Sequence, residues 1–139
     1  MLKYSNLDQA GVKKIALELG KQLKNRPAII GLVGPLGSGK TTFVKAFARQ
    51  FNIHKISSPT FVLRHEYPIK QGKLYHLDFY RLQKPKQLTN LGLDEILGYE
   101  NIILIEWVDK FPKMQKQCDI LITFKVKPKN IRDVIIQTK

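Results

Sequence analysis

The sequence has little cysteine, few acidic residues and no long apolar run. Cys118 is the only cysteine among 139 residues, so a single chain can form neither an internal disulfide nor a cysteine-based zinc cluster. No apolar run approaches the roughly 20 residues of a membrane-spanning helix, and no apolar signal core follows the first residues. We therefore expect a cytoplasmic protein that is not secreted and has no membrane partner.

The shortage of acidic residues leaves a strongly basic chain. There are 24 Lys and Arg against 11 Asp and Glu, a formal net charge of +13. Such a charge suits a nucleic acid or an acidic protein as partner, but exposed lysines on an ordinary solvated surface would give the same count. Most of the excess is scattered rather than interleaved with aromatic residues, which leaves both interpretations open.

Length and hydrophobic content indicate how many domains the chain can form. With 139 residues, of which 43% are hydrophobic, the chain is long enough for one globular core and has no disordered composition. The sequence contains no repeat, linker or low-complexity tract, so we predict a single domain over residues 1–139.

One stretch carries the strongest chemical signal. Residues 34–41 match G-x-x-x-x-G-K-[ST], the P-loop that wraps nucleotide phosphates. An apolar segment of strand length precedes it at residues 28–33, and a helical period follows it, with Phe43, Phe47 and Phe51 four residues apart. Strand, glycine loop and helix in this order predict a nucleotide site.

The P-loop residues have separable roles. Glycines let backbone N–H groups turn toward the phosphates, and the helix N-terminus adds a partial positive charge. Lys40 is expected to reach the β- and γ-phosphates and the Thr41 hydroxyl to bind Mg²⁺. The predicted nucleotide contacts are Leu36, Gly37, Ser38, Gly39, Lys40, Thr41 and Thr42.

The remaining pattern alternates strands and helices. A capping box beginning at Ser5 predicts a helix that ends near residues 20–25, and its start is a candidate contact for the base. We predict an α/β fold of three layers, with a mixed, mostly parallel sheet and a C-terminal β-hairpin. Its other elements are a hairpin at 61–67 and 74–77, short helices between 88 and 97, a buried strand at 102–105, and the final hairpin at 120–126 and 131–137.

Two acids follow predicted strands and are candidates to serve the metal. Glu106 ends the apolar run at 102–105, and Asp78 ends the strand at 74–77. A carboxylate at the end of a strand beside the P-loop usually supports Mg²⁺ directly or through water. Each acid has a structural alternative as a helix cap or an ion-pair partner, for example of Arg81.

The other candidate site residues, Thr60 and Trp107, are supported only by their positions in the sequence. Thr60 lies in a loop 20 residues after Lys40, where a hydroxyl can sense the γ-phosphate and metal, although a Pro-Thr turn explains it equally. Trp107 either belongs to the core or lines the nucleotide site. His54, His65 and His76 show no metal-ligand spacing, and we interpret them as surface or packing residues.

Three classes of P-loop protein compete. The base-reading motif N-K-x-D and the switch D-x-x-G of GTPases are both absent. A small-molecule kinase needs an acceptor pocket and usually an Arg-bearing lid, for which Arg81 is available but the chain is short. An ATP-dependent accessory protein needs only a nucleotide site, a switch and a partner surface, and it fits the length best.

The ordered motifs resemble the TsaE family (older name YjeE) over about residues 28 to 108. The shared features are the P-loop, Ser58-Pro59-Thr60-Phe61, the H-x-D-x-Y-R-L segment at 76–82, Leu93-Asp94 and Ile105-Glu106-Trp107. The resemblance implies a small bacterial Mg²⁺-dependent ATPase, weakly active alone, that is required for threonylcarbamoyladenosine at position 37 of tRNAs reading codons that start with A. It also implies TsaB and TsaD as partners, TsaD being the transferase, with ATP turnover supporting the assembly and tRNA reached through the complex.

The resemblance carries roles to individual residues. Lys40 is similar to the family's phosphate lysine, Thr41 and Glu106 to its metal ligands, and Asp78 to an aspartate that matters for hydrolysis. Residues 58–60 resemble its switch-like loop. The chain departs from the family at residues 84–88, where it has lysines in place of the family's usual acidic residues. Arg132 lies near the position of an arginine in the family's C-terminal hairpin, and whether it has the same role is left open. A small-molecule kinase and a nucleotide-regulated RNA-binding module remain the alternatives.

Overall fold

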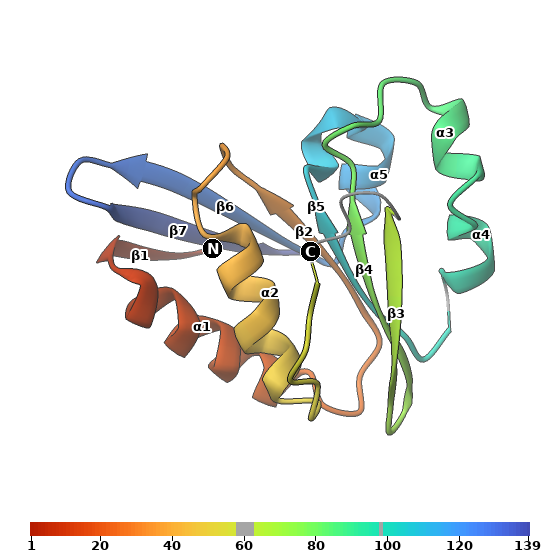
Figure 1. Cartoon of the computed structure of the whole chain (residues 1–139), viewed down its shortest axis with the longest axis horizontal. Helices are drawn as coiled ribbons and strands as arrows, with labels where there is room; N and C mark the ends of the chain where they lie inside the picture. Colours follow the sequence, from red (N-terminus) through yellow and green to blue (C-terminus); the bar gives the residue numbers. More distant parts are fainter. Residues whose placement is uncertain (58–62, 98) are drawn as a thin grey trace.

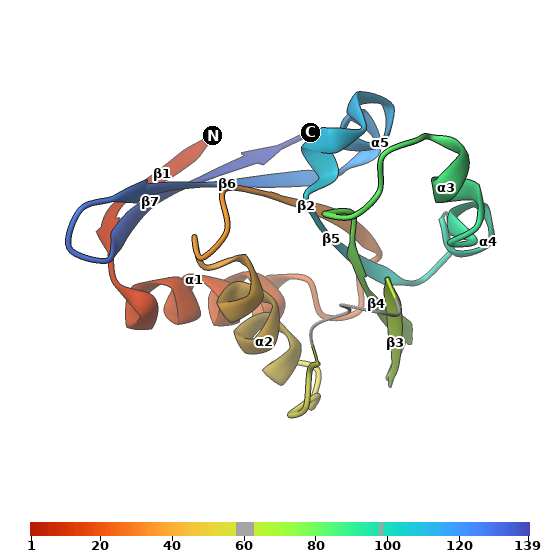
Figure 2. The same cartoon turned by 45° about the horizontal axis from the view of Figure 1, so that its top comes forward.

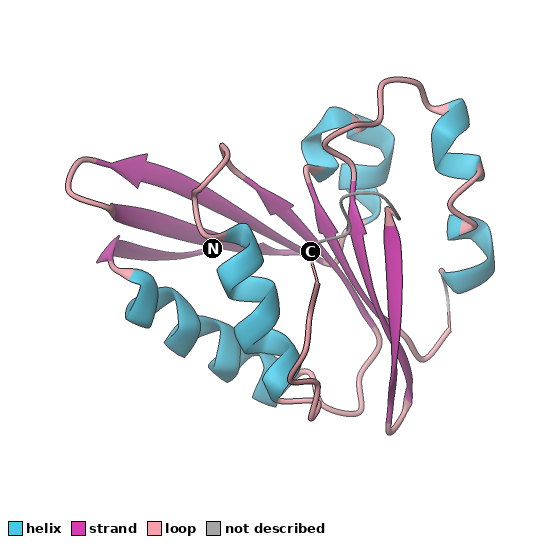
Figure 3. Cartoon of the chain, in the orientation of Figure 1, coloured by secondary structure: helices cyan, strands magenta, loops and turns pink. Residues whose placement is uncertain are grey.

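The computed structural model describes residues 1–57, 63–97 and 99–139. Strands and helices alternate along most of the chain, and Figure 3 distinguishes them by colour. The elements are Leu2–Leu7 (β1), Gln9–Gln22 (α1), Ala28–Val33 (β2), Lys40–Arg49 (α2), Arg64–Ile69 (β3), Gly72–Asp78 (β4), Lys86–Thr89 (α3), Leu93–Ile96 (α4), Ile102–Glu106 (β5), Val108–Lys110 (a 3₁₀ turn, η1), Pro112–Gln117 (α5), Ile120–Lys127 (β6) and Ile131–Thr138 (β7).

The strands of the described residues form one seven-stranded sheet in the order β1-β7-β6-β2-β5-β4-β3. Its centre is parallel, because β2 pairs in parallel with both β5 and β6, and β5 with β4. The outer pairs β1–β7, β6–β7 and β3–β4 are antiparallel. The predicted mixed sheet with a parallel core and a C-terminal hairpin is confirmed.

Helices cover both faces of the sheet, which gives the three predicted layers. In Figure 2, α1 and α2 lie together below the sheet while α5 lies above it. The central strands alternate accordingly: Ile102 and Leu104 belong to the core under α1 and α2, whereas Ile103 and Ile105 belong to the core shared with α4 and α5. Continuous apolar sequence in β5 thus reflects burial on both sides.

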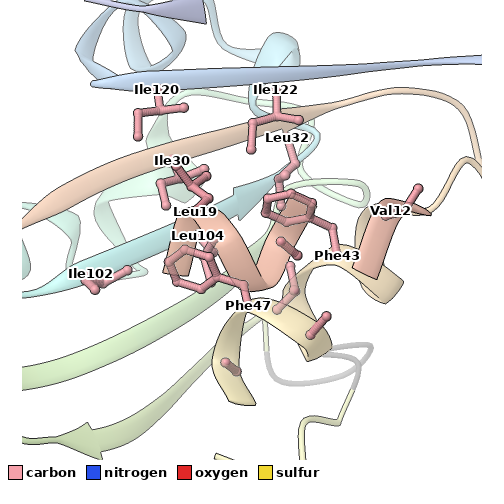
Figure 4. Packing of buried hydrophobic residues seen from close by; sticks show 14 of the residues in the cluster. Val12, Leu19, Ile30, Leu32, Phe43, Phe47, Ile102, Leu104, Ile120 and Ile122 are labelled. Carbon is pink, nitrogen blue, oxygen red and sulfur yellow. The ribbon is translucent and has the colours of Figure 1, made fainter. Parts of the chain in front are cut away.

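The helix after the P-loop is fixed by its phenylalanines. Phe43 and Phe47 are fully buried and stack with ring centroids 6.2 Å apart. Figure 4 shows them packed among Ile30, Leu32 and Leu104 of the central strands. The apolar face of α2 therefore anchors the loop that precedes it at the end of β2.

The N-terminus differs from the prediction. The capping box at Ser5 is wrong, because Ser5 lies in β1, which pairs with β7 at the edge of the sheet. The residue that caps α1 is Asp8, whose carboxylate accepts the Gly11 N–H at 2.8 Å. The chain thus crosses from the sheet edge to the helical layer in a single residue.

Among the residues that the structure describes, no helix combines the length and the apolar character needed to cross a bilayer. The sequence pattern did not reveal the turn η1 and the helix α5, whose residues Val108 and Met114 belong to the core shared with α4. Helix α5 (light blue in Figure 1) lies on the face of the sheet opposite α1 and α2.

Candidate functional site

The P-loop joins the carboxyl end of β2 to the N-terminus of α2. Gly37 and Gly39 have φ values of 74° and 112°, a region that L side chains rarely adopt. Gly39 is the N-cap residue of α2 and has no side chain to cap the helix. Since the first N–H groups of a helix lack acceptors within it, they form a ready site for an anion.

Lys40 is folded back over this loop. Its ammonium donates to the carbonyls of Gly34 and Pro35, the latter at 2.9 Å, and lies 4.2 Å from the centre of the Trp107 ring. The residue is buried. Burial lowers the pKa of the Lys40 ammonium, and the carboxylates of Glu106, Asp78 and Asp109 oppose that shift. The cation is therefore held beside the helix N-terminus.

The two predicted acids meet at one edge of the sheet. Asp78 of β4 lies directly opposite Glu106 of β5, and Glu106 lies opposite Leu32 of β2. The Thr41 hydroxyl donates to Glu106 Oε1 at 3.3 Å. Parallel strands end at the same edge, so the register brings both carboxylates to the mouth of the P-loop.

Asp78 is half-buried at the end of β4. Its Oδ1 accepts the Tyr80 N–H at 2.9 Å. Burial raises the pKa of Asp78, while the Tyr80 hydrogen bond opposes the shift and the charge of Glu106 adds to it. A carboxylate with a raised pKa beside a phosphate site is suited to accept a proton.

Trp107 adopts a left-handed conformation directly after β5, with φ of 61°. Its N–H donates to Leu32 O at 3.0 Å, and its ring lies 4.9 Å from that of Tyr80. For a bulky residue this conformation is strained, and such strain concentrates at functional sites. In this conformation the Trp107 ring contacts Lys40 and lines the cavity.

These groups line a cavity of about 300 Å³. It collects residues from both ends of the chain, including side chains that the sequence pattern did not single out. Its walls are Gln9, Leu36, Gly37, Ser38, Gly39, Lys40, Thr41, Thr42, Asp78, Tyr80, Glu106, Trp107, Asn130 and Arg132.

Arg132 brings a second cation to this cavity. The residue is only 2% exposed, and its guanidinium is held by Asn130 through the carbonyl at 3.2 Å and the side-chain oxygen at 3.1 Å. Gly39 lies close enough that an added Cβ would be 3.7 Å from Arg132 Nη1. The hairpin β6–β7 thus extends the P-loop wall with a fixed positive charge.

The donors fit a nucleoside triphosphate with Mg²⁺. Arg132 Nε and the Ser38 hydroxyl are buried without a hydrogen-bond partner within the described residues, and unpaired polar groups at a cavity are suited to a polar ligand. No group of three or more metal-ligating side chains occurs in that part of the chain. Thr41 and Glu106 alone would hold a Mg²⁺ that takes its other ligands from phosphate and water.

Of the predicted site residues, all but one lie around this cavity. Leu36 to Thr42, Asp78, Glu106 and Trp107 line it together, as expected for one site. Thr60 lies outside the described residues. The predicted alternative roles of Asp78 and Glu106, as a helix cap or an ion-pair partner, stay predictions.

Four side chains at the site were not among the residues predicted for it. Gln9, Tyr80 and Asn130 line the cavity, and His76, interpreted as a surface or packing residue, is buried against Glu106 at 2.6 Å. His76 was detectable, because in strand β4 it stands two positions before Asp78 and so on the same face. Asn130 carried no comparable signal, whereas Gln9 begins α1, the helix whose start was a candidate contact for the base.

Comparisons with known proteins identify the family. A family model described as "Threonylcarbamoyl adenosine biosynthesis protein TsaE" matches residues 7–134. A relative from Aquifex aeolicus (strain VF5), named tRNA threonylcarbamoyladenosine biosynthesis protein TsaE, is 37% identical over 91% of this chain and 88% of its own length.

A relative of the same name from Haemophilus influenzae is 34% identical over 79% of this chain and 70% of its own. A crystal structure of Bacillus subtilis YdiB superposes with a TM-score of 0.78 at 30% identity, covering 99% of this chain and 84% of that one. The chain therefore belongs to the TsaE family of tRNA threonylcarbamoyladenosine biosynthesis proteins.

Proposed function

We propose that this protein is a Mg²⁺-dependent ATPase that acts in threonylcarbamoyladenosine modification of tRNA. The observation that carries the proposal is the contact of the P-loop hydroxyl of Thr41 with the strand-end carboxylate of Glu106 at 3.3 Å, beside the buried ammonium of Lys40. Family membership supports the pathway, and the location that we propose for the protein is the cytoplasm.

Each residue has a definite task in the proposed reaction. The α2 N-terminus and Lys40 bind the phosphates and offset their charge, and Arg132 adds a second cation from the hairpin. Thr41 and Glu106 hold Mg²⁺, which when bound neutralises charge developing on the phosphates. Asp78 would orient the attacking water and accept its proton, and the rings of Trp107 and Tyr80 line the same cavity.

The partners proposed for this ATPase are TsaD and TsaB. The catalytic role of Thr60, which lies outside the described residues, is a proposal that rests on the sequence alone. Co-purification of the three proteins with and without ATP tests the assembly: we expect nucleotide to change the amount of this protein that is retained.

Mutation of the site separates binding from hydrolysis. Lys40→Ala is expected to weaken ATP binding about 10- to 100-fold, since a charge-assisted hydrogen bond contributes about 1.5–3 kcal/mol. Asp78→Asn and Glu106→Gln are expected to lower turnover, by roughly 100-fold for the proton acceptor, with a smaller loss of ATP affinity. Release of labelled phosphate and equilibrium ATP binding are the measurements.

Lys45→Ala is the matched control, because Lys45 lies exposed on the same helix and away from the cavity. Unchanged binding and turnover in all three site variants would refute the assignment. Transfer of the label into a small metabolite instead of inorganic phosphate would favour the kinase alternative.

Contact with RNA is a second candidate function, favoured by the distribution of charge. Between residues 9 and 57 the only acidic residue is Glu18, whereas eight exposed basic side chains occur there. None of the eight forms an ion pair among the contacts described. They are Lys13, Lys14, Lys21, Lys24, Arg26, Lys45, Arg49 and Lys55.

A further inference from the structure

His76 is a fully buried polar side chain in the middle of β4. Its Nε2 lies 2.6 Å from Glu106 Oε2, in a pair whose side chains are 0% and 5% exposed. A buried carboxylate needs hydrogen-bond donors to offset its loss of water. His76 and Thr41 supply one donor to each oxygen of Glu106.

The register of the sheet explains how the imidazole reaches this carboxylate. His76 lies opposite Leu104 and Asp78 lies opposite Glu106, so His76 is two residues further into β4 than the acid pair. Residues two apart in a strand share a face. His76 therefore stands behind Glu106, on the core side, while Thr41 and the cavity lie in front of it.

The hydrogen bonds define the tautomer. His76 Nδ1 is buried with no partner among the described residues, whereas Nε2 faces a carboxylate oxygen, which only accepts. The ring proton that matters is therefore on Nε2 and is donated to Glu106. The contact is directional, because it fixes one oxygen of Glu106 and leaves the other turned to Thr41.

We propose that His76 is a positioning residue that holds the Glu106 carboxylate in the orientation required to bind Mg²⁺ with Thr41. This inference rests on the proposed nucleotide site. Groups that hydrogen-bond a metal ligand orient it, and their loss typically costs 10–100-fold in metal affinity. Without His76, Oε2 of Glu106 loses its buried donor and the carboxylate is free to rotate away from Thr41.

Two amide substitutions test the position of the donor. The amide nitrogen of His76→Gln reaches about as far as Nε2, whereas that of His76→Asn reaches only as far as Nδ1, so the first retains the donor to Glu106 and the second does not. Leu74→Val is the matched control, since Leu74 is buried in the same strand and shares the face of His76.

The readout is nucleotide binding rather than turnover. Trp107, the only tryptophan, lines the cavity, so its fluorescence follows the titration of ATP in EDTA and of MgCl₂ at fixed ATP. In EDTA, we expect the ATP affinity of His76→Asn to be within about twofold of that of the parent protein. The variant should need about 10- to 100-fold more Mg²⁺ to reach the same enhancement of ATP binding. His76→Gln and Leu74→Val should stay close to the parent.

An equal loss with and without Mg²⁺, or equal behaviour of the Gln and Asn variants, would overturn the positioning role. If the unaltered protein binds ATP with no dependence on Mg²⁺, the proposed metal site itself fails and this inference falls with it. That result differs from a Mg²⁺-dependent parent whose Asn variant is unchanged, which refutes His76 alone.

Nitrogen NMR of the unaltered protein gives a test that does not depend on folding of the variants. We expect a protonated Nε2 on His76 whose resonance shifts when MgCl₂ is added to the ATP-bound protein. His54 and His65, which do not line the cavity, are internal controls. A proton found on Nδ1, or an Nε2 resonance unmoved by Mg²⁺, would contradict the proposal.

Discussion

The Arg132 guanidinium is buried, and no ion pair with a carboxylate is found for it among the described residues. Asn130 supplies the two oxygens that accept from Nη2, and Nε has no partner within the described structure. A buried cation is costly unless it is paired. Nucleotide phosphates bound at the neighbouring P-loop would supply the missing negative charge.

Arg132→Ala is therefore expected to weaken ATP binding by about tenfold or more, because a charged hydrogen bond contributes about 1.5–3 kcal/mol. Arg132→Lys should restore little, since a lysine has no planar fork of donors. Titration of Trp107 fluorescence with ATP measures both. Arg49→Ala, which removes an exposed arginine from α2, is the control, and ATP affinity that is equal in all four proteins would rule out the contact.

At the scale of elements, the corner between β1 and α1 depends on Asp133. Asp133 Oδ1 in β7 accepts the Asn6 N–H at 3.0 Å and pairs with Lys127 at 3.0 Å. Lys127 also donates to the Asn6 side chain at 3.1 Å. This network holds the irregular end of β1, where Asn6 has φ of 57°, and so places the start of α1 beside the cavity.

The same network makes stability depend on pH. The Asn6 hydrogen bond, with Lys127, lowers the pKa of Asp133 below its usual 3.8. A carboxylate with a lowered folded-state pKa stabilises the protein above the unfolded value and loses that effect as the pH falls through the folded value. Asp133→Asn should lower the free energy of unfolding near pH 7.

The difference between Asp133→Asn and the parent is expected to shrink as the pH falls below 3.8 and to vanish in stronger acid. Urea unfolding followed at several pH values measures it. Asp94→Asn removes the same charge from the exposed surface of α4 and serves as the control. A destabilisation of the Asp133 variant that is constant with pH would show that the charge is not responsible.

At the scale of the whole molecule, the basic residues are unevenly placed. The layer formed by α1 and α2 on one face of the sheet (Figure 2) carries most of the eight exposed basic side chains between residues 9 and 57. Lys13, Lys14 and Lys21 line one shallow groove between α1 and Gln50. A face of this kind attracts the phosphate backbone of RNA.

A Lys13→Glu/Lys21→Glu protein is expected to bind tRNA more weakly and with a smaller dependence on salt, because each lost phosphate contact reduces the slope of log affinity against log salt by about 0.7–0.9. Filter binding at two or more salt concentrations measures the slope. Lys125→Glu, an exposed site on β6, is the control. If the parent protein binds no tRNA even at low salt, the RNA candidate is removed.

Much of the fold was predictable because its determinants are local. The P-loop glycines, the phenylalanine period of α2 and the apolar run of β5 each constrain backbone conformation within a few residues. The strand β1 was not predictable in this way. Its backbone is satisfied by β7 at the other end of the chain, and Ser5 and Asp8 both resemble a helix cap in sequence.

The sequence by itself determined the phosphate-binding loop, with Lys40 and Thr41, and identified Asp78 and Glu106 as strand-end acids, because spacing and motif encode local geometry. Only the tertiary structure decided that Asp78 and Glu106 face each other, that His76 stands behind Glu106, and that Arg132 closes the cavity. Those relations depend on strand register and on contacts across 28 to 93 residues of chain, which no local pattern specifies.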